Sequence, residues 1–429
     1  MIVDKIKQIF KIPDLKKSIL FVLGMIVIFR FAAHIPMPGV DISALKNFFG
    51  SNQFLGLMNM FSGGGMTNFS VVMLGIAPYI TAAIIIELLT VVVPKLEEIS
   101  KEGESGYQKI NQYTRLLTVP LAIMQSIGMI ALLRQSSRNI IGNMGTFQLI
   151  TTIATITAGT IFMMWIGELI SEKQIGNGIS LLIFAGIVSH LPEAIQQTIA
   201  VSWGNITLEF LISLAILLAI TIFMIVAIII VTEGYRKLAI SYARQIRSNK
   251  TYGGMDSHLP IKVNQSGMIP IIFAISVIVF PPMIAQFFKN AHTAFIANSA
   301  NFITSLFQNQ IFYIIFFFLL VLGFTYFYTS IIFHPDQMAE NLQRQGAFIP
   351  GIRPGKPTAD HINYVNSRIM LGGAMFLGFV AVLPLMLQPF LDFKNLMVSG
   401  ASLLIIVGVV IEIMEAINAQ LVMREYEEL

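Results

Sequence analysis

The chain has 429 residues, of which 55% are hydrophobic and only 12% are charged, and its formal net charge is +4. Because soluble domains are about 25% charged, this composition excludes an ordinary soluble protein and indicates one embedded in a lipid bilayer. The chain contains no cysteine, which excludes disulfides, thiolate nucleophiles and zinc–thiolate sites.

Ten apolar stretches follow one another along the chain. Each is close to the ~20 residues that cross a hydrocarbon core of ~30 Å, and runs of this length satisfy their backbone in lipid as helices. We therefore predict an all-α polytopic membrane protein with ten transmembrane helices. The stretches lie at roughly 18–35, 70–93, 115–133, 147–170, 177–199, 208–231, 267–287, 310–333, 368–388 and 400–420.

Residues 1–17 form a basic opening with five lysines. Such an opening is also typical of a cleaved signal peptide, but Arg30 interrupts the apolar run and no clear small-x-small cleavage site ends it. We expect a basic interfacial segment that leads into an uncleaved span. Most of the 27 Lys and Arg residues fall on the N-terminal side of the predicted membrane, so the positive-inside rule places both termini in the cytoplasm.

Two predicted cytoplasmic connections, 232–266 and 334–366, are longer than the others and basic. Loops this long in a compact fold are usually functional, and basic ones attract acidic or RNA-bearing partners. Charge that only controls membrane topology explains them equally well.

Two pairs of short motifs indicate an internal repeat. "GIAPYI" (residues 75–80) matches "GMIPII" (267–272), and "GISLLI" (178–183) matches "GASLLI" (400–405). The second helix thus corresponds to the seventh and the fifth to the tenth. Because five is odd, the two halves, 18–207 and 208–421, enter the membrane in opposite directions, around a central pore. Residues 422–429 form a cytoplasmic tail.

The repeated motifs carry isoleucines at matching positions. Ile80 pairs with Ile272 and Ile183 with Ile405, while Ile76 and Ile179 lie one turn earlier on the same helix faces. Isoleucine stripes in membrane helices commonly face lipid or neighbouring helices. If these six surround the axis between the halves, they form a collar that sheds water and blocks ions.

A glycine-rich segment, "FLGLMNMFSGGGMTNFS" (54–70), lies between the first two helices. Gly63, Gly64 and Gly65 allow a sharp bend, and re-entrant backbone is tolerated where it lines a cavity. The segment is either a half-helix that folds back as a movable plug, 54–69, or an interfacial helix.

Catalytic motifs do not emerge from the sequence. There is no His-Glu-x-x-His pair, P-loop or Gly-x-Ser-x-Gly elbow, so we expect no enzyme, no metal site and no cofactor. The acids Glu87, Glu168, Glu412 and Glu415 lie toward the predicted cytoplasmic ends of their helices. A secondary transporter would need polar substrate contacts near the midplane, and an intramembrane hydrolase would need a nucleophile–base pair; both remain alternatives.

The chain resembles the SecY family of bacterial protein-conducting channels from its first helix to its last. The resemblance rests on motifs that occur together and in order. They are "IPMPGV", "NMFSGGG", "GIAPYITAAIIIELLT", "GNGISLLIFAGIV", "SHLPIKVNQSGMIPIIFA", "HPDQMAENLQRQGAFIPGIRPGK" and "GASLLIIVGVV". It implies a subunit that passes unfolded secretory polypeptides across the membrane and releases transmembrane segments sideways into lipid.

The resemblance also implies roles for particular residues. The pore ring would be Ile76, Ile80, Ile179, Ile183, Ile272 and Ile405. The plug would cover about 58–67, including Met58, Asn59, Met60, Phe61, Ser62, Gly63, Gly64 and Gly65. The lateral gate would include Thr81, Glu87, Gln125 and Phe280, where Glu87 replaces the glutamine usual in the family. Contacts with a motor or ribosome would involve Arg236, Lys237, Arg244, Arg247 and Arg353.

Partners follow from the same resemblance. They would be the small membrane subunits SecE and SecG, the SecA ATPase, the ribosome, signal sequences with the nascent polypeptide, and membrane lipid. No sequence-specific nucleic acid is expected. The resemblance places the protein in the bacterial plasma membrane.

Overall fold

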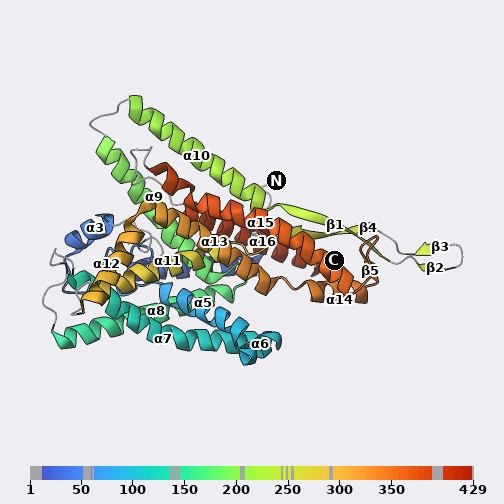
Figure 1. Cartoon of the computed structure of the whole chain (residues 1–429), viewed down its shortest axis with the longest axis horizontal. Coiled ribbons are helices and arrows are strands. Elements are labelled where there is room, and N and C mark those ends of the chain that lie inside the picture. The colour runs from blue at the N-terminus through green and yellow to red at the C-terminus, as the bar shows by residue number, and fades with distance from the viewer. Residues whose placement is uncertain are drawn as a thin grey trace. The chain divides into compact units, whose positions relative to one another are not determined.

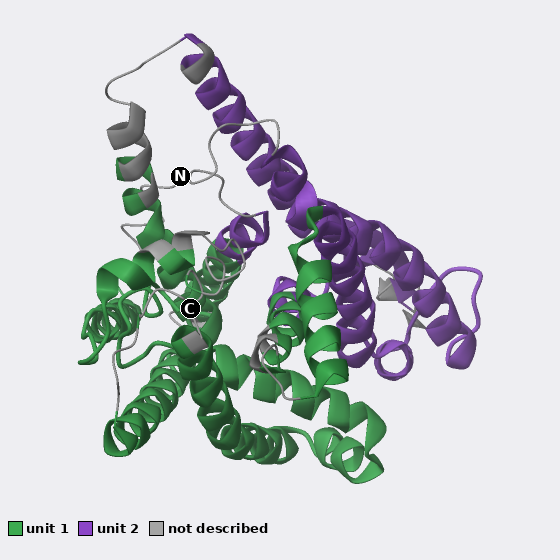
Figure 2. Ribbon diagram, turned by 60° about the vertical axis from the view of Figure 1, so that its left-hand side comes forward, with its two compact units in different colours: residues 1–205, 275–310, 409–429 green, residues 206–274, 311–408 purple. Residues whose placement is uncertain are grey.

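A computed structural model gives the fold. It describes residues 12–51, 59, 62–135, 140, 145–202, 208–242, 245–247, 250–252, 256–288, 293–388 and 400–427. The chain divides into two compact units, coloured separately in Figure 2. Unit 1 comprises residues 1–205, 275–310 and 409–429, and unit 2 comprises 206–274 and 311–408.

Unit 1 is helical. It contains α2 (Pro13–Ala33), α3 (Ile42–Ser51), α5 (Ala77–Val92), α6 (Pro94–Lys101), α7 (Glu104–Gln135), α8 (Thr146–Ser171), α9 (Gly178–Ser202) and α12 (Ala294–Gln308), with most of α11 (Ile269–Phe288) and the later part of α16 (Gly400–Glu427). Within it, α5 packs on α7, α7 on α8, and α8 on both α9 and α2.

Unit 2 combines apolar helices with strands. Its helices are α10 (Leu208–Thr232), α13 (Gln310–Ile332), α14 (Pro335–Arg344) and α15 (Lys356–Leu387). Its strands are β1 (Tyr235–Tyr242), β2 (Gln245–Arg247), β3 (Lys250–Tyr252), β4 (Asp256–Lys262) and β5 (Ala347–Phe348). The first turns of α11 and α16 complete it.

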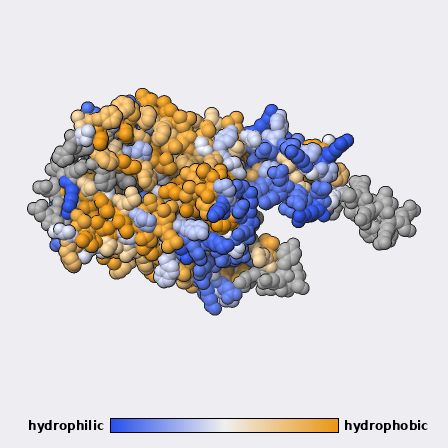
Figure 3. Space-filling view, turned by 60° about the horizontal axis from the view of Figure 1, so that its bottom comes forward, coloured by the Kyte–Doolittle hydropathy of each residue, from blue (hydrophilic) through white to orange (hydrophobic). Residues whose placement is uncertain are grey.

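Each of the ten predicted apolar stretches overlaps a helix, which confirms the all-α membrane fold class. Among the described residues, six helices are long and apolar enough to cross a bilayer: α7, α8, α10, α15, α16 and the span that contains α13. A seventh is added if the bent pair α5–α6 counts as one span, and α9 and α11 hold shorter apolar helices. Hydrophobic side chains cover a broad part of the face in Figure 3. The count of ten crossings stays a prediction.

Three helices begin well away from where hydropathy predicts. One is α7, which begins at Glu104 and not near residue 115. The stretch at 70–93 becomes helical only at Ala77, because Gly75 has a positive φ of 54° and Pro78 stands in the first turn. By contrast, α15 begins at Lys356, well before residue 368, with Pro357 in its first turn. Its first part is polar, so hydropathy reports only the apolar remainder.

The two long connections form structure together. β1 pairs antiparallel with β4 and with β5, giving the sheet order β4-β1-β5, while β2 and β3 form a separate hairpin (Figure 1). One apolar cluster joins both connections to the start of α15; it comprises Leu238, Ile240, Ile261, Leu342, Ala347, Ile349 and Ile362. We call this assembly of β1, β4, β5, α14 and the start of α15 the sheet lobe.

The compact units and the predicted halves are different divisions. The unit boundary at 205/206 lies close to the predicted boundary at 207/208, while 275–310 and 409–429 cluster with unit 1. The inverted orientation of the halves concerns the membrane and stays a prediction.

Candidate functional site

The repeated motifs have the same local structure in both copies. Gly75 and Gly267 have positive φ values of 54° and 62°, and a helix begins two residues later at Ala77 and at Ile269. Only glycine adopts this backbone at little cost. The conformation explains why the motif Gly-x-x-Pro-x-Ile occurs twice: its glycine closes a turn and its proline opens a helix.

The second motif pair is explained by close packing. A Cβ on Gly178, at the start of α9, would lie 1.9 Å from the carbonyl oxygen of Gly167 on α8. A Cβ on Gly400, at the start of α16, would likewise lie 1.9 Å from the carbonyl oxygen of Val380 on α15. In each unit, therefore, the glycine lets a helix start directly against its predecessor. This equivalence supports the predicted repeat.

Five of the six predicted ring isoleucines are buried, and Ile179 is half-buried. Ile76, Ile80, Ile179 and Ile183 belong to unit 1, and Ile272 and Ile405 belong to unit 2. Each stands in or beside the first two turns of its helix, either one or five residues after a repeated glycine.

The start of α9 is held by polar contacts. The Asn177 side-chain oxygen accepts the backbone N–H groups of Ile179 (3.0 Å) and Ser180 (3.3 Å), which is the pattern of a helix N-cap. The Asn177 N–H in turn donates to Oε1 of Glu412 at 3.0 Å. Glu412 on α16 thus positions the helix that carries Ile179 and Ile183.

Residues 62–69 of the predicted plug form successive turns. Gly63 and Gly64 have positive φ values of 65° and 84°. Asn59 organises the segment: its carbonyl accepts the Gly64 N–H (3.0 Å) and the Ser62 hydroxyl (3.0 Å), and its side-chain oxygen accepts the Thr67 N–H (3.0 Å). Met58, Met60 and Phe61 lie outside the described residues.

The same segment is packed against α2 and α9. Arg30 on α2 donates from Nη1 to the carbonyl oxygen of Gly63 at 2.6 Å. A Cβ on Gly63 would lie 2.5 Å from Cζ of the buried Phe29, and one on Gly64 would lie 3.1 Å from Cε1 of His190. The backbone at Gly63 therefore lies so close to the Phe29 ring that any side chain at this position would require Phe29 to move.

These anchoring residues were not predicted as a site. In the sequence, Arg30 is only a charge that interrupts an apolar run, and 33 positions separate it from Gly63. An arginine within a membrane span usually pairs with an acid or a backbone carbonyl. This rule is the signal by which a partner for Arg30 could have been expected.

Two of the predicted gate residues are in contact. Gln125 on α7 donates from Nε2 to the hydroxyl oxygen of Thr81 on α5 at 3.4 Å, and the Thr81 hydroxyl donates to the Ala77 carbonyl at 3.0 Å. Both side chains are buried. Glu87, further along α5, has a buried Oε2 with no hydrogen-bond partner in the described part of the chain. Phe280 is half-buried on α11.

An ion pair that the sequence analysis did not predict joins α7 to α8. Nε of Arg115 lies 2.6 Å from Oε1 of Glu168. Glu168 is therefore paired, and this pairing explains how a span tolerates the acid.

The predicted partner contacts lie in unit 2. Arg236 and Lys237 are exposed on β1, and the Lys237 ammonium lies 5.4 Å from the centre of the Tyr235 ring. Arg353 is exposed in the turn between β5 and α15, where its carbonyl accepts the Thr358 hydroxyl at 2.9 Å. Arg247 lies in β2, while Arg244 falls outside the described residues.

Comparisons with known proteins agree with this architecture. The sequence model of the family described as SecY matches residues 70–414. A relative from Streptomyces scabiei, "Protein translocase subunit SecY", is 40% identical, and the match covers 97% of each chain.

Solved structures share the fold at low sequence identity. One described as "The structure of a protein conducting channel" superposes with a TM-score of 0.63 at 16% identity, covering 95% of this chain and 92% of the other. "Sec61 in the Canine ribosome-channel complex from the endoplasmic reticulum" gives 0.57 at 14% identity, with 93% and 91% covered. From the extent of the family match and the 40% identity over nearly its whole length, this multi-pass membrane protein belongs to the SecY family.

Proposed function

We propose that this chain is the channel subunit through which unfolded secretory polypeptides cross the membrane and from which apolar segments enter lipid. The observation that carries the proposal is the glycine-rich segment 62–69, folded back against α2 and held there by polar contacts and close packing. A segment of this kind suits a seal that opens, since it consists of turns and can move without any helix being unwound.

Each polar contact that holds this plug is modest in energy. A hydrogen bond to a charged group, such as the one from Arg30 to Gly63, contributes about 1.5–3 kcal/mol. A neutral one, such as that from the Asn68 side chain to the Ala33 carbonyl on α2, contributes about 1 kcal/mol. Met66 and Phe69 are also buried, which contributes about 1.5–3 kcal/mol for each side chain. An entering polypeptide must therefore replace this apolar packing as well as the hydrogen bonds.

The pore ring is proposed from side-chain chemistry. Isoleucine offers no hydrogen bond, so a constriction of Ile76, Ile80, Ile179, Ile183, Ile272 and Ile405 would not bind any one passing sequence. A narrow apolar ring also sheds water and resists ions. Burial of five of the six supports an inward role over a lipid-facing one.

Lateral release is proposed at α5, α7 and α11, which carry Thr81, Glu87, Gln125 and Phe280. The Gln125–Thr81 hydrogen bond is long, at 3.4 Å, and therefore weak. A transmembrane segment gains roughly 0.8 kcal/mol for each CH₂ that leaves water. Transfer into lipid thus outweighs the loss of this contact.

The driving force for moving the polypeptide through the channel is proposed to come from partner proteins. SecA or a translating ribosome would engage the sheet lobe and the connection 232–266 through Arg236, Lys237, Arg244, Arg247 and Arg353. SecE and SecG would complete the channel in the bacterial plasma membrane, with both termini of this chain cytoplasmic.

A crosslinking experiment tests the path, because the chain has no cysteine. Ile80→Cys and Ile405→Cys are reconstituted in proteoliposomes with SecE, SecG, SecA and ATP, and a precursor with one cysteine is stalled in transit. We expect a disulfide with either variant. Leu319→Cys, on an exposed face of α13, is the matched control and should not crosslink.

Two outcomes contradict the proposal. Equal crosslinking at Leu319 would place the polypeptide outside the ring. Uptake of a small solute without an ATPase, together with no ATP-dependent export of the precursor, would favour a secondary transporter.

A further inference from the structure

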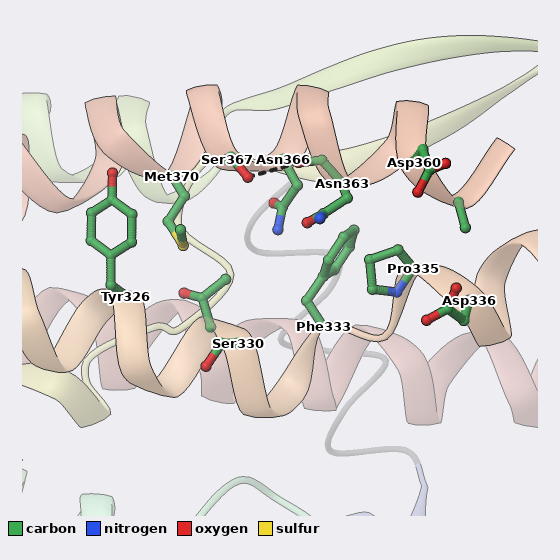
Figure 4. Close-up of a pocket in the computed structure, with 12 residues that line it drawn as sticks. Tyr326, Ser330, Phe333, Pro335, Asp336, Asp360, Asn363, Asn366, Ser367 and Met370 are labelled. Carbon is green, nitrogen blue, oxygen red and sulfur yellow. Dashed lines mark hydrogen bonds between the residues drawn. The ribbon is translucent and has the colours of Figure 1, made fainter. Parts of the chain in front are cut away.

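The ring of His190, on α9, differs from an ordinary buried polar group. Its Nε2 atom is buried and has no hydrogen-bond partner among the residues that the structure describes. Buried polar atoms normally have one, and even the exposed Ser367 hydroxyl, in the cleft between α13 and α15, donates to the Asn363 carbonyl at 2.9 Å (Figure 4). The exception at His190 therefore indicates a role other than stabilising the fold.

The unsatisfied edge of the His190 ring faces the plug. A Cβ on Gly64 would lie 3.1 Å from Cε1 and 3.3 Å from Nε2 of His190. The turn at Gly64 therefore covers Nε2, and water reaches this atom when the turn moves away. In the predicted topology α9 runs outward from Asn177, so this contact lies toward the outer side of the membrane.

Two charged side chains act on the His190 ring. Oε2 of Glu193, one turn further along α9, lies 3.6 Å from Nδ1. Arg30 on α2 is attracted to Glu193 and repels a protonated His190. The described part of the plug carries no titratable side chain, and neither do residues 146–160 of α8, which also packs on α9. The charge balance at the ring therefore depends on Arg30 and Glu193.

A protonated ring has one N–H too many for this site. When the proton of the neutral ring is on Nδ1, beside Glu193, Nε2 carries only a lone pair. Protonation adds an N–H at Nε2. The Asn59 carbonyl attracts this form, but its two lone pairs already accept the Gly64 N–H and the Ser62 hydroxyl, each at 3.0 Å. The added N–H would therefore be charged, buried and unsatisfied.

Glu193 compensates only weakly for this cost. Its side chain is 57% exposed, so water screens its attraction for a protonated His190. Burial of the ring and the positive charge of Arg30 both act in the opposite direction. The closed plug is therefore compatible with a neutral His190 and strained by a protonated one.

We propose that His190 is a proton-operated latch for the plug: the neutral ring packs against the closed turn at Gly64, and the protonated ring displaces it. Once the turn has moved, water accepts the hydrogen bond from Nε2. Protonation thus stabilises the displaced plug relative to the closed one, and the closed plug loses stability as the pH falls. This inference rests on the proposed role of segment 62–69 as a plug.

Conductance measured as a function of pH tests the latch. The full chain is reconstituted with SecE and SecG in planar bilayers, and the solution on both sides is taken from about pH 8 to pH 5, the range in which histidine changes its charge. We expect ion conductance to rise about tenfold, the effect of a difference of one unit in proton affinity between the two plug positions. His190→Gln stays neutral, so its conductance should not depend on pH.

Two further variants assign the response. Glu193→Gln removes the compensating charge and should enlarge the rise with acid; because Glu193 is exposed, this variant should fold even if His190→Gln does not. His34→Gln is the matched control. His34 is an exposed histidine at the end of α2, with Nδ1 at 2.8 Å from the Arg30 carbonyl, and its loss should leave the response to acid intact.

Three results would overturn the latch: a parent chain whose conductance does not rise with acid, an equal rise in His190→Gln, and a smaller rise in Glu193→Gln. Gly63→Ala, which forces the plug against Phe29, separates this failure from failure of the plug itself. If Gly63→Ala conducts at pH 8 while the parent ignores acid, the plug stands and the latch is wrong. If neither conducts, segment 62–69 is not the seal.

Discussion

Two glycine-rich turns of this molecule use the same backbone conformation in opposite surroundings. Gly63 in the plug and Gly351 before Arg353 have φ values of 65° and 83°. A Cβ on Gly63 would lie 2.5 Å from Cζ of Phe29, whereas a Cβ on Gly351 would meet nothing within 4 Å. The first glycine is required by both backbone and packing, and the second by backbone alone.

The difference matches the roles proposed for the two turns. A plug must pack closely against its neighbours to exclude water, so its turn has no room for a side chain. A turn that presents Arg353 to a partner must hold a shape in open water. Substitutions can therefore separate the cost of backbone strain from the cost of lost packing.

Gly63→Ala should produce the largest effect. It combines a positive-φ cost of about 1–2 kcal/mol with a clash against Phe29, and we expect the plug to move and ion conductance of proteoliposomes to rise. Gly351→Ala has the same backbone cost without the clash, so it should leave the membrane sealed. Equal conductance for the two variants would remove the distinction between the turns.

Arg30→Gln should have the next largest effect. The shorter, neutral side chain leaves the Gly63 carbonyl without its charged donor, a loss of about 1.5–3 kcal/mol. Conductance should rise, but less than for Gly63→Ala. Arg30→Lys keeps the charge and should leak less than Arg30→Gln; if the order is reversed, the hydrogen bond does not hold the plug.

Arg353→Ala probes the exposed turn. We expect motor-driven export in proteoliposomes to fall roughly tenfold, equivalent to about 1.4 kcal/mol, with no change in conductance or thermal stability. The fold is preserved because Thr358 bonds to the backbone carbonyl of Arg353. Arg344→Ala, another exposed arginine of the sheet lobe, is the control, and an equal loss of export there would assign the effect to general charge.

Glu87→Gln should give the smallest effect. The substitution removes a carboxylate whose Oε2 is buried with no hydrogen-bond partner among the residues that the structure describes, so gating should change while assembly does not. We expect a shift of a few-fold, below about 1 kcal/mol, in the acceptance of precursors with weak signal sequences. Selectivity identical to that of the parent chain would show that this carboxylate has no part in the gate.

Hydropathy predicted the helices well because it is a local property. All ten apolar stretches overlap helices, since a run of about 20 apolar residues needs no distant partner to become helical in lipid. The errors occur where polar sequence is helical, as at the start of α15, or where one glycine delays a helix, as at Gly75.

Contacts between residues far apart in the chain have no signature in local sequence patterns. The Arg30–Gly63 hydrogen bond and the pairing of Ser241 with Phe348 join positions that no local pattern connects. The repeat is an exception, because it is visible in sequence: Gly178 and Gly400 recur since both helices start against a carbonyl. The ring itself joins residues of two units and stays a prediction.

The shared apolar cluster of the sheet lobe has a mechanical consequence. β1 follows α10 after a short bend, and Ile362 in the same cluster belongs to α15. A partner that binds near Arg353 therefore applies force to both long connections, 232–266 and 334–366. The reason is that Leu238 of the first and Ile349 of the second belong to one apolar cluster. The sheet lobe thus moves as one body, and force applied to it is transmitted both to the end of α10 and to the start of α15.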